Sequence, residues 1–451
     1  MARPLECQFF IYYWEIIIEM ITSKNSKRVL LKNGLIIDPL NNKEFFSDIL
    51  IKNGKIDSIK KSIKTENDYL VIDCKGLVIT HGFCDIHVHF REPGREDKEN
   101  LESGSYAAIA GGFTQVCTMP NTNPIIDSPE SIYFIVSRSK DLPIDIFPIG
   151  AISKNQEGEK LTEMLLMKDN GAIAFSDDGN PIQNSQFMKL ALTYSKMIDT
   201  PIINHAEDVP LRNEGVMNAG SNSNNLGLRG NPNSAEAIMV YRDLLLASQL
   251  KSKIHIPHVS TKESVDLIKN FKKGNPFISA EVTPHHIYFD DSSINSSNYN
   301  TNLKVAPPIR SKKDCKALIE GLKNGTIDCI ATDHAPHTIE EKETTFNDAA
   351  FGMIGLESCF AAVNKILVKK NKMSLLTLIQ KLSTNPRKIM GIEADLFKEG
   401  SSAQITILDP DLKWTFSLDS VYSKSINSPF LNQELIGKVK FVLSKNRIFY
   451  L

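Results

Sequence analysis

Histidine and aspartate side chains recur along the chain where short apolar runs end. His87 and His89 are separated by one residue, so both imidazoles lie on one face of an extended segment. Residues of the same two types follow later apolar runs: Asp177-Asp178, His205, His258 and Asp333-His334. Imidazole nitrogens suit zinc, and a carboxylate can bridge two cations. Four of the histidines and two of the aspartates, if they converge, would therefore make a ligand set for two metal ions.

A pair of metal ions favours hydrolysis or its reversal. Two ions about 3.5 to 4 Å apart acidify a water molecule and polarise a carbonyl group. Asp333 is the best candidate for a second task besides ligation, which is to take a proton from the attacking water and pass it to the leaving nitrogen. Ligation alone is the simpler interpretation of the same residue.

The apolar runs that position these residues alternate with amphipathic helical stretches from about residue 78 to about residue 391. Eight of the runs are predicted to be strands: 85–87, 116–118, 146–148, 172–175, 201–204, 254–256, 277–279 and 329–331. Repeated strand and helix units over roughly 250 to 300 residues are typical of a parallel barrel, whose carboxyl strand ends carry the active site. We therefore predict an α/β fold with a (β/α)8 TIM-like barrel over residues 80–395.

The two ends of the chain have the alternating pattern of short strands. Asn33-Gly34 and Asn53-Gly54 lie between such runs and are strong signals for hairpin turns. Similar runs occur at 402–408, 413–416 and 438–450. Residues 28–79 together with 396–451 are therefore predicted to form one small β-sandwich domain.

Residues 1–27 are interpreted as an N-terminal extension. An aromatic and aliphatic run at 9–18 raises the alternative of a targeting or anchor segment. Glu15 and Glu19 interrupt this run, which is shorter than the roughly 20 apolar residues needed to span a bilayer. Met20 is a candidate for the true start, since recognisable strand patterning begins soon after it.

The bulk composition restricts the partners. The 451 residues are 41% hydrophobic and 23% charged, which is typical of a globular protein with a packed core. A formal net charge of -1 gives no sign of the basic face that nucleic-acid binding requires, so we expect a small-molecule substrate and neither nucleic acid nor membrane. Seven cysteines stand singly, without a CxxC pair, which predicts reduced thiols and a cytoplasmic location.

Six segments of the chain resemble the successive motifs of type I dihydroorotases in the amidohydrolase superfamily. They are His87-Val88-His89-Phe90-Arg91-Glu92-Pro93-Gly94, Met119-Pro120-Asn121-Thr122-Asn123-Pro124, Ser176-Asp177-Asp178-Gly179, His258-Val259-Ser260-Thr261-Lys262-Glu263, Glu281-Val282-Thr283-Pro284-His285-His286 and Ala331-Thr332-Asp333-His334-Ala335-Pro336-His337. The resemblance runs from about residue 32 to about residue 409. It implies the interconversion of dihydroorotate and carbamoyl aspartate, a step of pyrimidine synthesis.

The resemblance also implies a division of the ligands between two zinc ions. His87, His89 and Asp333 would hold one ion, and His205 and His258 the other. Asp178 would bridge them, because the family uses the second aspartate of the pair. Asp177 would then orient its neighbour, and no lysine stands near 174–176 to replace the bridging carboxylate.

Five residues are predicted to bind the substrate. Arg91 stands two residues beyond His89 and would clamp the substrate carboxylate, since a guanidinium binds a carboxylate in a bidentate way. An ion pair with a nearby glutamate, Glu92 or Glu96, is the plainer alternative. The resemblance adds hydrogen bonds from Asn121 and His337, and backbone contacts from Phe351-Gly352.

Some positions depart from the family pattern or have secondary roles. Ala306 stands where many type I enzymes have Asn, so one side-chain contact to the substrate would be missing. His81 replaces a usual proline, which we interpret as a structural change. His285, His286 and His334 are expected to support the site or to pack rather than to bind metal.

Two other functions compete with this interpretation. A related hydrolase of hydantoin, dihydropyrimidine or allantoin rings would favour a bridging lysine and would not need the clamp of Arg91 and Asn121. An inactive scaffold subunit would have lost a metal ligand, and none is lost here. The resemblance leaves open a homodimer or an association with aspartate transcarbamoylase.

Overall fold

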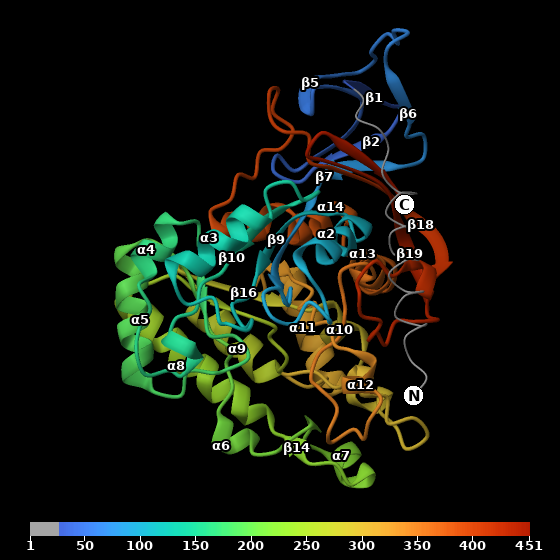
Figure 1. The fold of residues 1–451 in the computed structure, drawn as a ribbon. Helices are drawn as coiled ribbons and strands as arrows, with labels where there is room; N and C mark the ends of the chain where they lie inside the picture. Colours follow the sequence, from blue (N-terminus) through green and yellow to red (C-terminus); the bar gives the residue numbers. More distant parts are fainter. Residues whose placement is uncertain (1–26) are drawn as a thin grey trace, which may run out of the picture.

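The computed structural model describes residues 27–451, which form helices, two parallel sheets and two further sheets built near the chain ends (Figure 1). The predicted N-terminal extension, residues 1–27, lies outside the described residues except for its last position. Within the described range, every helix is too short or too polar to cross a bilayer. The mixed α/β content expected from the sequence is confirmed.

Two parallel sheets occupy the middle of the chain. One has the strand order β10-β9-β8, and the other has the order β11-β12-β15-β16-β17. Single parallel bridges connect the sheets, from Val88 to His334 and from Gly150 to Phe175. The strands are β8 (Phe83–Val88), β9 (Phe113–Thr118), β10 (Asp145–Pro148), β11 (Phe175–Ser176), β12 (Ile202–Ile203), β15 (Ile254–Ile256), β16 (Ile278–Val282) and β17 (Cys329–Ile330). Each of the eight predicted strand segments contains one of these strands or part of it, so those predictions are confirmed.

Helices follow most of these strands and lie outside them. Figure 1 shows α4, α5 and α8 on the outer side of the strands β10 and β16. Side-chain caps fix several helix starts, because a polar side chain accepts a hydrogen bond from a free backbone N–H there. The Thr261 side chain, for example, accepts from Ser264 N at the start of α9. The helices are α2 (Leu101–Ala110), α3 (Pro129–Arg138), α4 (Met164–Asp169), α5 (Ser185–Met197), α6 (Val209–Arg212), α7 (Ser221–Leu226), α8 (Asn233–Leu250), α9 (Lys262–Phe271), α10 (Pro284–Tyr288), α11 (Lys312–Asn324), α12 (Ile339–Lys342), α13 (Cys359–Val363), α14 (Leu375–Leu382) and α15 (Thr384–Met390).

The parallel strands are buried on both faces. Alternate residues of one strand point to opposite sides. Cys84 and Ile86 of β8 share one buried cluster with Cys117 of β9 and Cys329 of β17. Phe83, next to Cys84, instead belongs to the larger cluster that includes helix residues. Strands covered on both sides explain why their sequences are nearly continuous apolar runs.

Strands from both ends of the chain pair in one sheet. Its order is β20-β19-β18-β7-β2-β3, and β18 pairs antiparallel with β7 through Ile405 and His81. A four-stranded sheet of order β5-β4-β1-β6 shares a hydrophobic cluster with it. The strands are β1 (Arg28–Lys32), β2 (Leu35–Asp38), β3 (Lys43–Phe46), β4 (Asp48–Lys52), β5 (Lys55–Lys60), β6 (Leu70–Asp73), β7 (Val78–His81), β18 (Ile405–Thr415), β19 (Glu434–Ser444) and β20 (Arg447–Tyr450). A further short parallel pair is formed by β13 (Met217–Asn218) and β14 (Gly230–Asn231).

One of the two predicted hairpin turns is wrong. Asn53-Gly54 does join two paired strands, since Lys52 of β4 lies opposite Lys55 of β5. Asn33-Gly34 instead connects β1 and β2, which belong to different sheets. Asn33 has a positive φ of 64°, and its backbone N–H donates to Asp48 Oδ1. The Asn33-Gly34 turn therefore connects the four-stranded sheet to the six-stranded sheet.

Candidate metal centre

The predicted ligands all lie at or just beyond the carboxyl ends of parallel strands. His87 belongs to β8, and His89 follows it directly. Three of the others come two or three residues after β11, β12 and β17, namely Asp178, His205 and Asp333. His258 stands two residues after β15. Since parallel strands end at one edge, residues far apart in sequence meet there, and all six side chains are buried.

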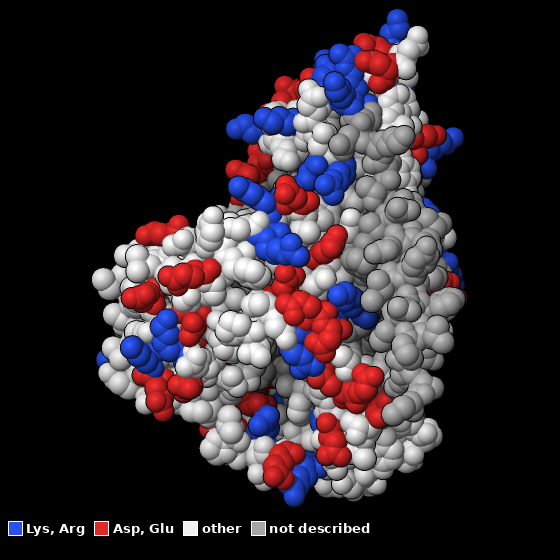
Figure 2. Space-filling view, viewed as in Figure 1, with Lys and Arg blue, Asp and Glu red and all other residues white. Residues whose placement is uncertain are grey.

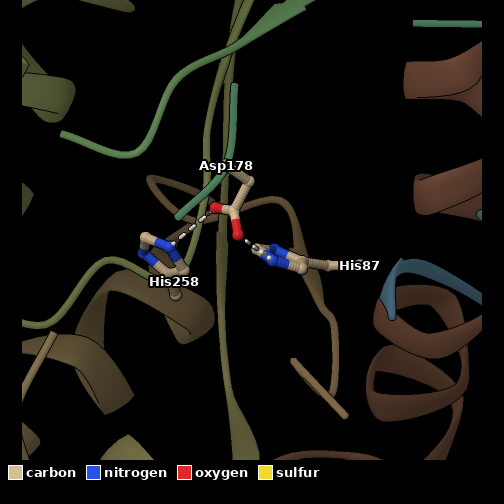
Figure 3. A group of neighbouring side chains, drawn as sticks. All are labelled: His87, Asp178 and His258. Carbon is tan, nitrogen blue, oxygen red and sulfur yellow. Dashed lines mark ion pairs between the residues drawn. The ribbon is translucent and has the colours of Figure 1, made fainter. Parts of the chain in front are cut away.

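Asp178 lies between two pairs of histidines. Its Oδ2 atom is 3.6 Å from His87 Nε2 and 3.4 Å from His89 Nε2. Its Oδ1 atom is 3.6 Å from His205 Nδ1 and 3.4 Å from His258 Nε2. Figure 3 shows the Asp178 carboxylate between His87 and His258, with one oxygen directed to each ring. Each oxygen thus serves a different pair, which is the geometry of a bridging ligand.

Asp333 completes the group around the first histidine pair. Its Oδ1 atom is 3.1 Å from His89 Nε2 and 3.5 Å from His87 Nε2. The ligand atoms of His87, His89 and Asp333 are close enough together to hold one metal ion, and so are those of His87, Asp178 and His258. His205 Nδ1 lies 3.0 Å from His258 Nε2 and joins the second group.

Buried polar atoms without partners indicate that the side chains fit a cation. Among the described residues, His87 Nε2 and Asp178 Oδ1 are buried and form no hydrogen bond. Such atoms are rare in folded proteins, because burial without a partner costs free energy. Both atoms point into the space between the histidines and carboxylates. Imidazole and carboxylate donors are those that divalent zinc prefers.

The pKa values of the buried side chains also indicate that the site favours positive charge. Burial alone would raise the pKa of Asp178, but His87, His205 and His258 outweigh it and hold that pKa well below its usual range. Burial would lower the pKa of His205, but Asp178 and Glu207 outweigh it and raise the pKa to about 10. Both shifts show that the site favours positive charge among these side chains. Protonated imidazoles supply that charge in the absence of metal, and a bound cation would take their place.

Two of the proposed ligands have unusual backbone conformations. His258 has φ 33° and Asp333 has φ 50°, both in the left-handed region that non-glycine residues seldom adopt. Such strain persists only where surrounding structure fixes it, and it clusters at functional sites. His258 stands two residues after β15 and Asp333 three residues after β17, where the turn aims the side chain at the other ligands.

Further polar groups orient the histidine rings from behind. Asn121 Oδ1 lies 2.9 Å from His89 Nδ1, and Glu281 Oε1 lies 2.7 Å from His87 Nδ1. Ring nitrogens held in this way leave the other nitrogen free for a metal. Asp177 accepts hydrogen bonds from the backbone N–H groups of Ile152 and Ser153, at 2.8 and 3.0 Å. The Asp177 carboxylate is therefore held by the backbone of Ile152 and Ser153.

The predicted substrate residues form a second group. Arg91 Nε donates to Pro336 O at 3.3 Å, and its Nη2 atom is 3.5 Å from His337 Nε2. The same His337 nitrogen is 2.8 Å from Phe351 O, and Gly352 follows with φ 132°. The predicted alternative partners of Arg91 are engaged elsewhere, since Glu92 pairs with Arg138 and Glu96 accepts from Gly94 N. Asn121 lies apart from this group, at His89.

The other histidines have the surroundings of supporting residues. His334 lies 3.3 Å from Glu99 through Nε2 and accepts from Gly355 N through Nδ1. Burial lowers the pKa of His285 to about 4 and holds that of His286 well below its usual range. His81 is buried and packs edge-on against Phe397. Ala306 precedes Pro307, whose carbonyl oxygen lies 3.0 Å from His286 Nε2.

Two residues at the site have roles that the sequence does not predict. Asn427 accepts from His337 N and donates to Ala335 O and Gly352 O, at 3.1, 3.1 and 3.2 Å. It stands 75 to 92 positions from these residues in an irregular C-terminal segment, so no periodic pattern marks it. Glu281 belongs to one of the family-like motifs, and an acidic residue inside an apolar strand was the available signal.

Comparisons with known proteins establish the fold first. The chain is similar in structure to an L-hydantoinase (dihydropyrimidinase) from Arthrobacter aurescens, with a TM-score of 0.82, 24% identity and coverage of 93% of this chain and 95% of that one. A dihydropyrimidinase from Brevibacillus agri gives a TM-score of 0.81 at 21% identity, over 93% and 94% of the two chains. The molecule therefore has the fold of the hydantoinases.

Sequence relatives identify the family. Residues 76–264 match the family model described as dihydro-orotase-like. A dihydroorotase from Caldicellulosiruptor saccharolyticus is 45% identical over 422 residues, which cover 93% of this chain and 98% of that protein. A dihydroorotase from Geobacter metallireducens is 42% identical over 94% of this chain and 99% of that protein. The chain belongs to the dihydroorotase family.

The two adjacent aspartates are expected to differ in metal binding. Asp178→Asn replaces a carboxylate that lies between two histidine pairs by a neutral amide, so the bound divalent metal should fall to about half of the wild-type content or less. Asp177→Asn should keep the metal, because the carboxylate of Asp177 contacts the backbone of Ile152 and Ser153. Elemental analysis of dialysed protein measures both. Full metal content in the Asp178 variant would contradict the bridging geometry.

Proposed function

We propose that the protein is a dihydroorotase that interconverts N-carbamoyl-L-aspartate and (S)-dihydroorotate plus water, a step of pyrimidine (UMP) synthesis. The observation that carries the proposal is the position of Asp178, with one oxygen near His87 and His89 and the other near His205 and His258. Membership of the dihydroorotase family indicates which hydrolytic reaction such a site would perform. Ring closure consumes a proton, because a dicarboxylate becomes a monocarboxylate, so low pH favours the ring.

The metal ligands would be shared between two zinc ions. His87, His89 and Asp333 would hold one, His205 and His258 the other, and Asp178 both. Bound zinc lowers the pKa of a water molecule and polarises a carbonyl oxygen. The metal dependence of such hydrolases and the donor set support this proposal, and the distances between donors leave each ion its own pair of histidines.

Asp333 would carry the proton during the reaction. Its Oδ1 atom lies beside His89 Nε2, so it faces the same space as the metal ligands. Burial would raise its pKa, but His87 and His89 outweigh it and keep the carboxylate ionised. An ionised carboxylate can take the proton of the attacking water and return it to the ring nitrogen that leaves.

Arg91 would bind the substrate carboxylate. Burial lowers its pKa to about 10, so the guanidinium stays charged at neutral pH. Its Nε atom contacts Pro336 O and its Nη2 atom lies near His337. His337, Asn121 and the backbone of Phe351 and Gly352 would complete the contacts to the ring. Pairing with a carboxylate would compensate for the water that burial removes from Arg91.

We also propose that the two parallel sheets are one eight-stranded barrel over residues 80–395. The bridges from Val88 to His334 and from Gly150 to Phe175 support closure at both seams. The shared interior cluster of Cys84, Cys117 and Cys329 supports it as well. Residues 28–79 with 396–451 would form the small β-sandwich domain, and residues 1–27 the N-terminal extension.

The partners and location follow from the same proposal. The substrate is a small molecule, and the chain could act as a homodimer or beside aspartate transcarbamoylase. On the face drawn in Figure 2, lysine and arginine alternate with aspartate and glutamate, which favours neither nucleic acid nor an anionic membrane. The described cysteines are free and buried, which suits the cytoplasm.

A substrate comparison tests the proposed function. Purified protein should turn over dihydroorotate much faster than hydantoin or allantoin, because the ring contacts include a clamp for a carboxylate. Prolonged chelation should remove most of the activity, and added zinc should restore it. Preference for hydantoin would favour the related hydrolase instead. Metal-loaded protein without any turnover would favour the inactive scaffold.

Asp333→Asn should lower kcat by about 100- to 10,000-fold, because the amide cannot accept the proton. Ligation through the amide oxygen should leave substrate binding largely intact. Steady-state kinetics with metal content measured on the same sample separates the two effects. Near-full turnover would reject the proton-transfer role of Asp333.

Arg91→Lys should raise KM for dihydroorotate by about 10- to 100-fold, since an ammonium group loses the bidentate contact. The matched control is Arg138→Lys, because Arg138 is exposed and pairs with Glu92 away from the metal centre. Steady-state kinetics measures KM of both variants. Equal KM values would count against the clamp.

A further inference from the structure

A row of polar side chains runs through the interior beneath the metal centre. Ser279 Oγ lies 2.8 Å from His255 Nδ1, and His255 Nε2 lies 3.1 Å from Glu281 Oε2. The other oxygen of Glu281 lies 2.7 Å from His87 Nδ1. His255, Glu281 and His87 are fully buried. These four residues, called the polar column below, form an unbroken hydrogen-bonded chain that ends on a proposed metal ligand.

The polar column begins at the opposite end of the parallel strands from the metal centre. Ser279 and Glu281 are two residues apart on β16, so both side chains lie on one face of the strand. Ser279 lines a cavity of about 1020 Å³. That cavity is also lined by Pro201, Ile254 and Ile278, which stand at the amino ends of β12, β15 and β16. The column therefore runs along the strands from their amino ends toward their carboxyl ends.

We propose that Glu281 and His255 are positioning residues of the metal centre. Glu281 holds the ring of His87 through Nδ1, and His255 holds Glu281 from behind. This inference rests on the proposed function, because it assumes that His87 binds a metal ion. Neither residue touches the substrate or the reacting atoms.

Glu281 contacts both halves of the proposed metal centre. The same Oε1 atom that accepts from His87 Nδ1 also accepts from the backbone N–H of His258, at 3.4 Å. His87 belongs to the first histidine pair and His258 to the second. A donating Nδ1–H leaves the lone pair of His87 on Nε2, which faces Asp178 and Asp333. The Glu281 carboxylate thus holds both the ring of His87 and the backbone of His258, whose φ is positive.

The free-energy cost of burying the Glu281 carboxylate argues for a functional role of this residue. Glu281 has no exposed surface, and the desolvation cost of a carboxylate buried among apolar strands often exceeds what pairing of its charge gives back. Apolar side chains of similar size would fill the interior as well, as Ile86 and Cys117 do nearby. Both oxygens of Glu281 have partners, His87 Nδ1 at 2.7 Å and His255 Nε2 at 3.1 Å.

A third metal ion is the competing explanation of the polar column. The ligand atoms of His255, Glu281 and Cys329 also lie close together. However, both ring nitrogens of His255 already have partners, Ser279 and Glu281. The geometry therefore favours support of His87 over a separate ion.

The test compares Glu281→Gln with wild type. Zinc affinity is measured by competition with a chromophoric chelator, and the cobalt-loaded proteins are compared by visible absorption. We expect the variant to bind metal about 10- to 100-fold more weakly and to lose kcat to a similar extent. KM should change by less than about twofold, since the substrate contacts remain. A changed cobalt spectrum would report the altered geometry of His87 independently of turnover.

A control and a second variant keep the test decisive. Asp48→Asn removes another buried carboxylate, which accepts from Asn33 N and Ile63 N in the terminal sheets. It should lower the thermal unfolding temperature of the metal-free protein without changing metal affinity. His255→Gln should show the Glu281 effect in weaker form, and it decides the question if Glu281→Gln does not fold.

The outcomes separate this inference from the proposed function. Wild type that binds metal and turns over dihydroorotate, with unchanged metal affinity and cobalt spectrum in the folded variants, would overturn the positioning role alone. A third bound ion that is lost in Cys329→Ser would overturn it as well. Wild type that binds no divalent cation would overturn the proposed function and this inference together.

Discussion

The shared carboxylate of Asp178 is the interaction on which the rest of the site depends. It is buried, ionised and surrounded by four histidine rings, none of which can satisfy both of its oxygens. Such an arrangement is stable only with positive charge close to the carboxylate. Two cations would meet this requirement, and they would create a place where water and a carbonyl group can react. The cations that would stabilise the buried Asp178 carboxylate are therefore the same ones that would activate the water and the carbonyl group.

Parallel strands make this cluster possible. Its members are spread from His87 to Asp333, yet each stands at the carboxyl end of a strand, and those ends meet at one edge. The strands are covered on both faces by apolar side chains, which keeps the backbone fixed at the points where the ligands begin. The polar column of Ser279, His255, Glu281 and His87 extends the same rigidity along the interior.

The sequence predicted the parallel strands well, because buried strands read as short apolar runs and polar residues follow them. It also placed His87 and His89 on one face through their spacing. Local spacing could not choose between Asp177 and Asp178, since adjacent residues point in opposite directions and either could face inward. Only family resemblance made that choice, and the contacts of Asp177 with Ile152 and Ser153 agree with it.

Features that depend on long-range pairing could not be predicted in this way. Asn33-Gly34 has the chemistry of a hairpin turn, but whether its two strands pair is decided by β6 and β7, which compete for the same edges. Asn427 organises the loops of His337 and Gly352 from an irregular segment far along the chain. The residues next to Asn427 in the sequence give no signal of this role, because the role exists only once the C-terminal segment is folded against the site.

Anomalous diffraction at the zinc absorption edge, on crystals of the protein grown with zinc, tests the central claim most directly. We predict two peaks in each chain, one on either side of the Asp178 carboxylate, with His87 and His89 at the first and His205 and His258 at the second. A single peak, or peaks away from Asp178, would contradict the account.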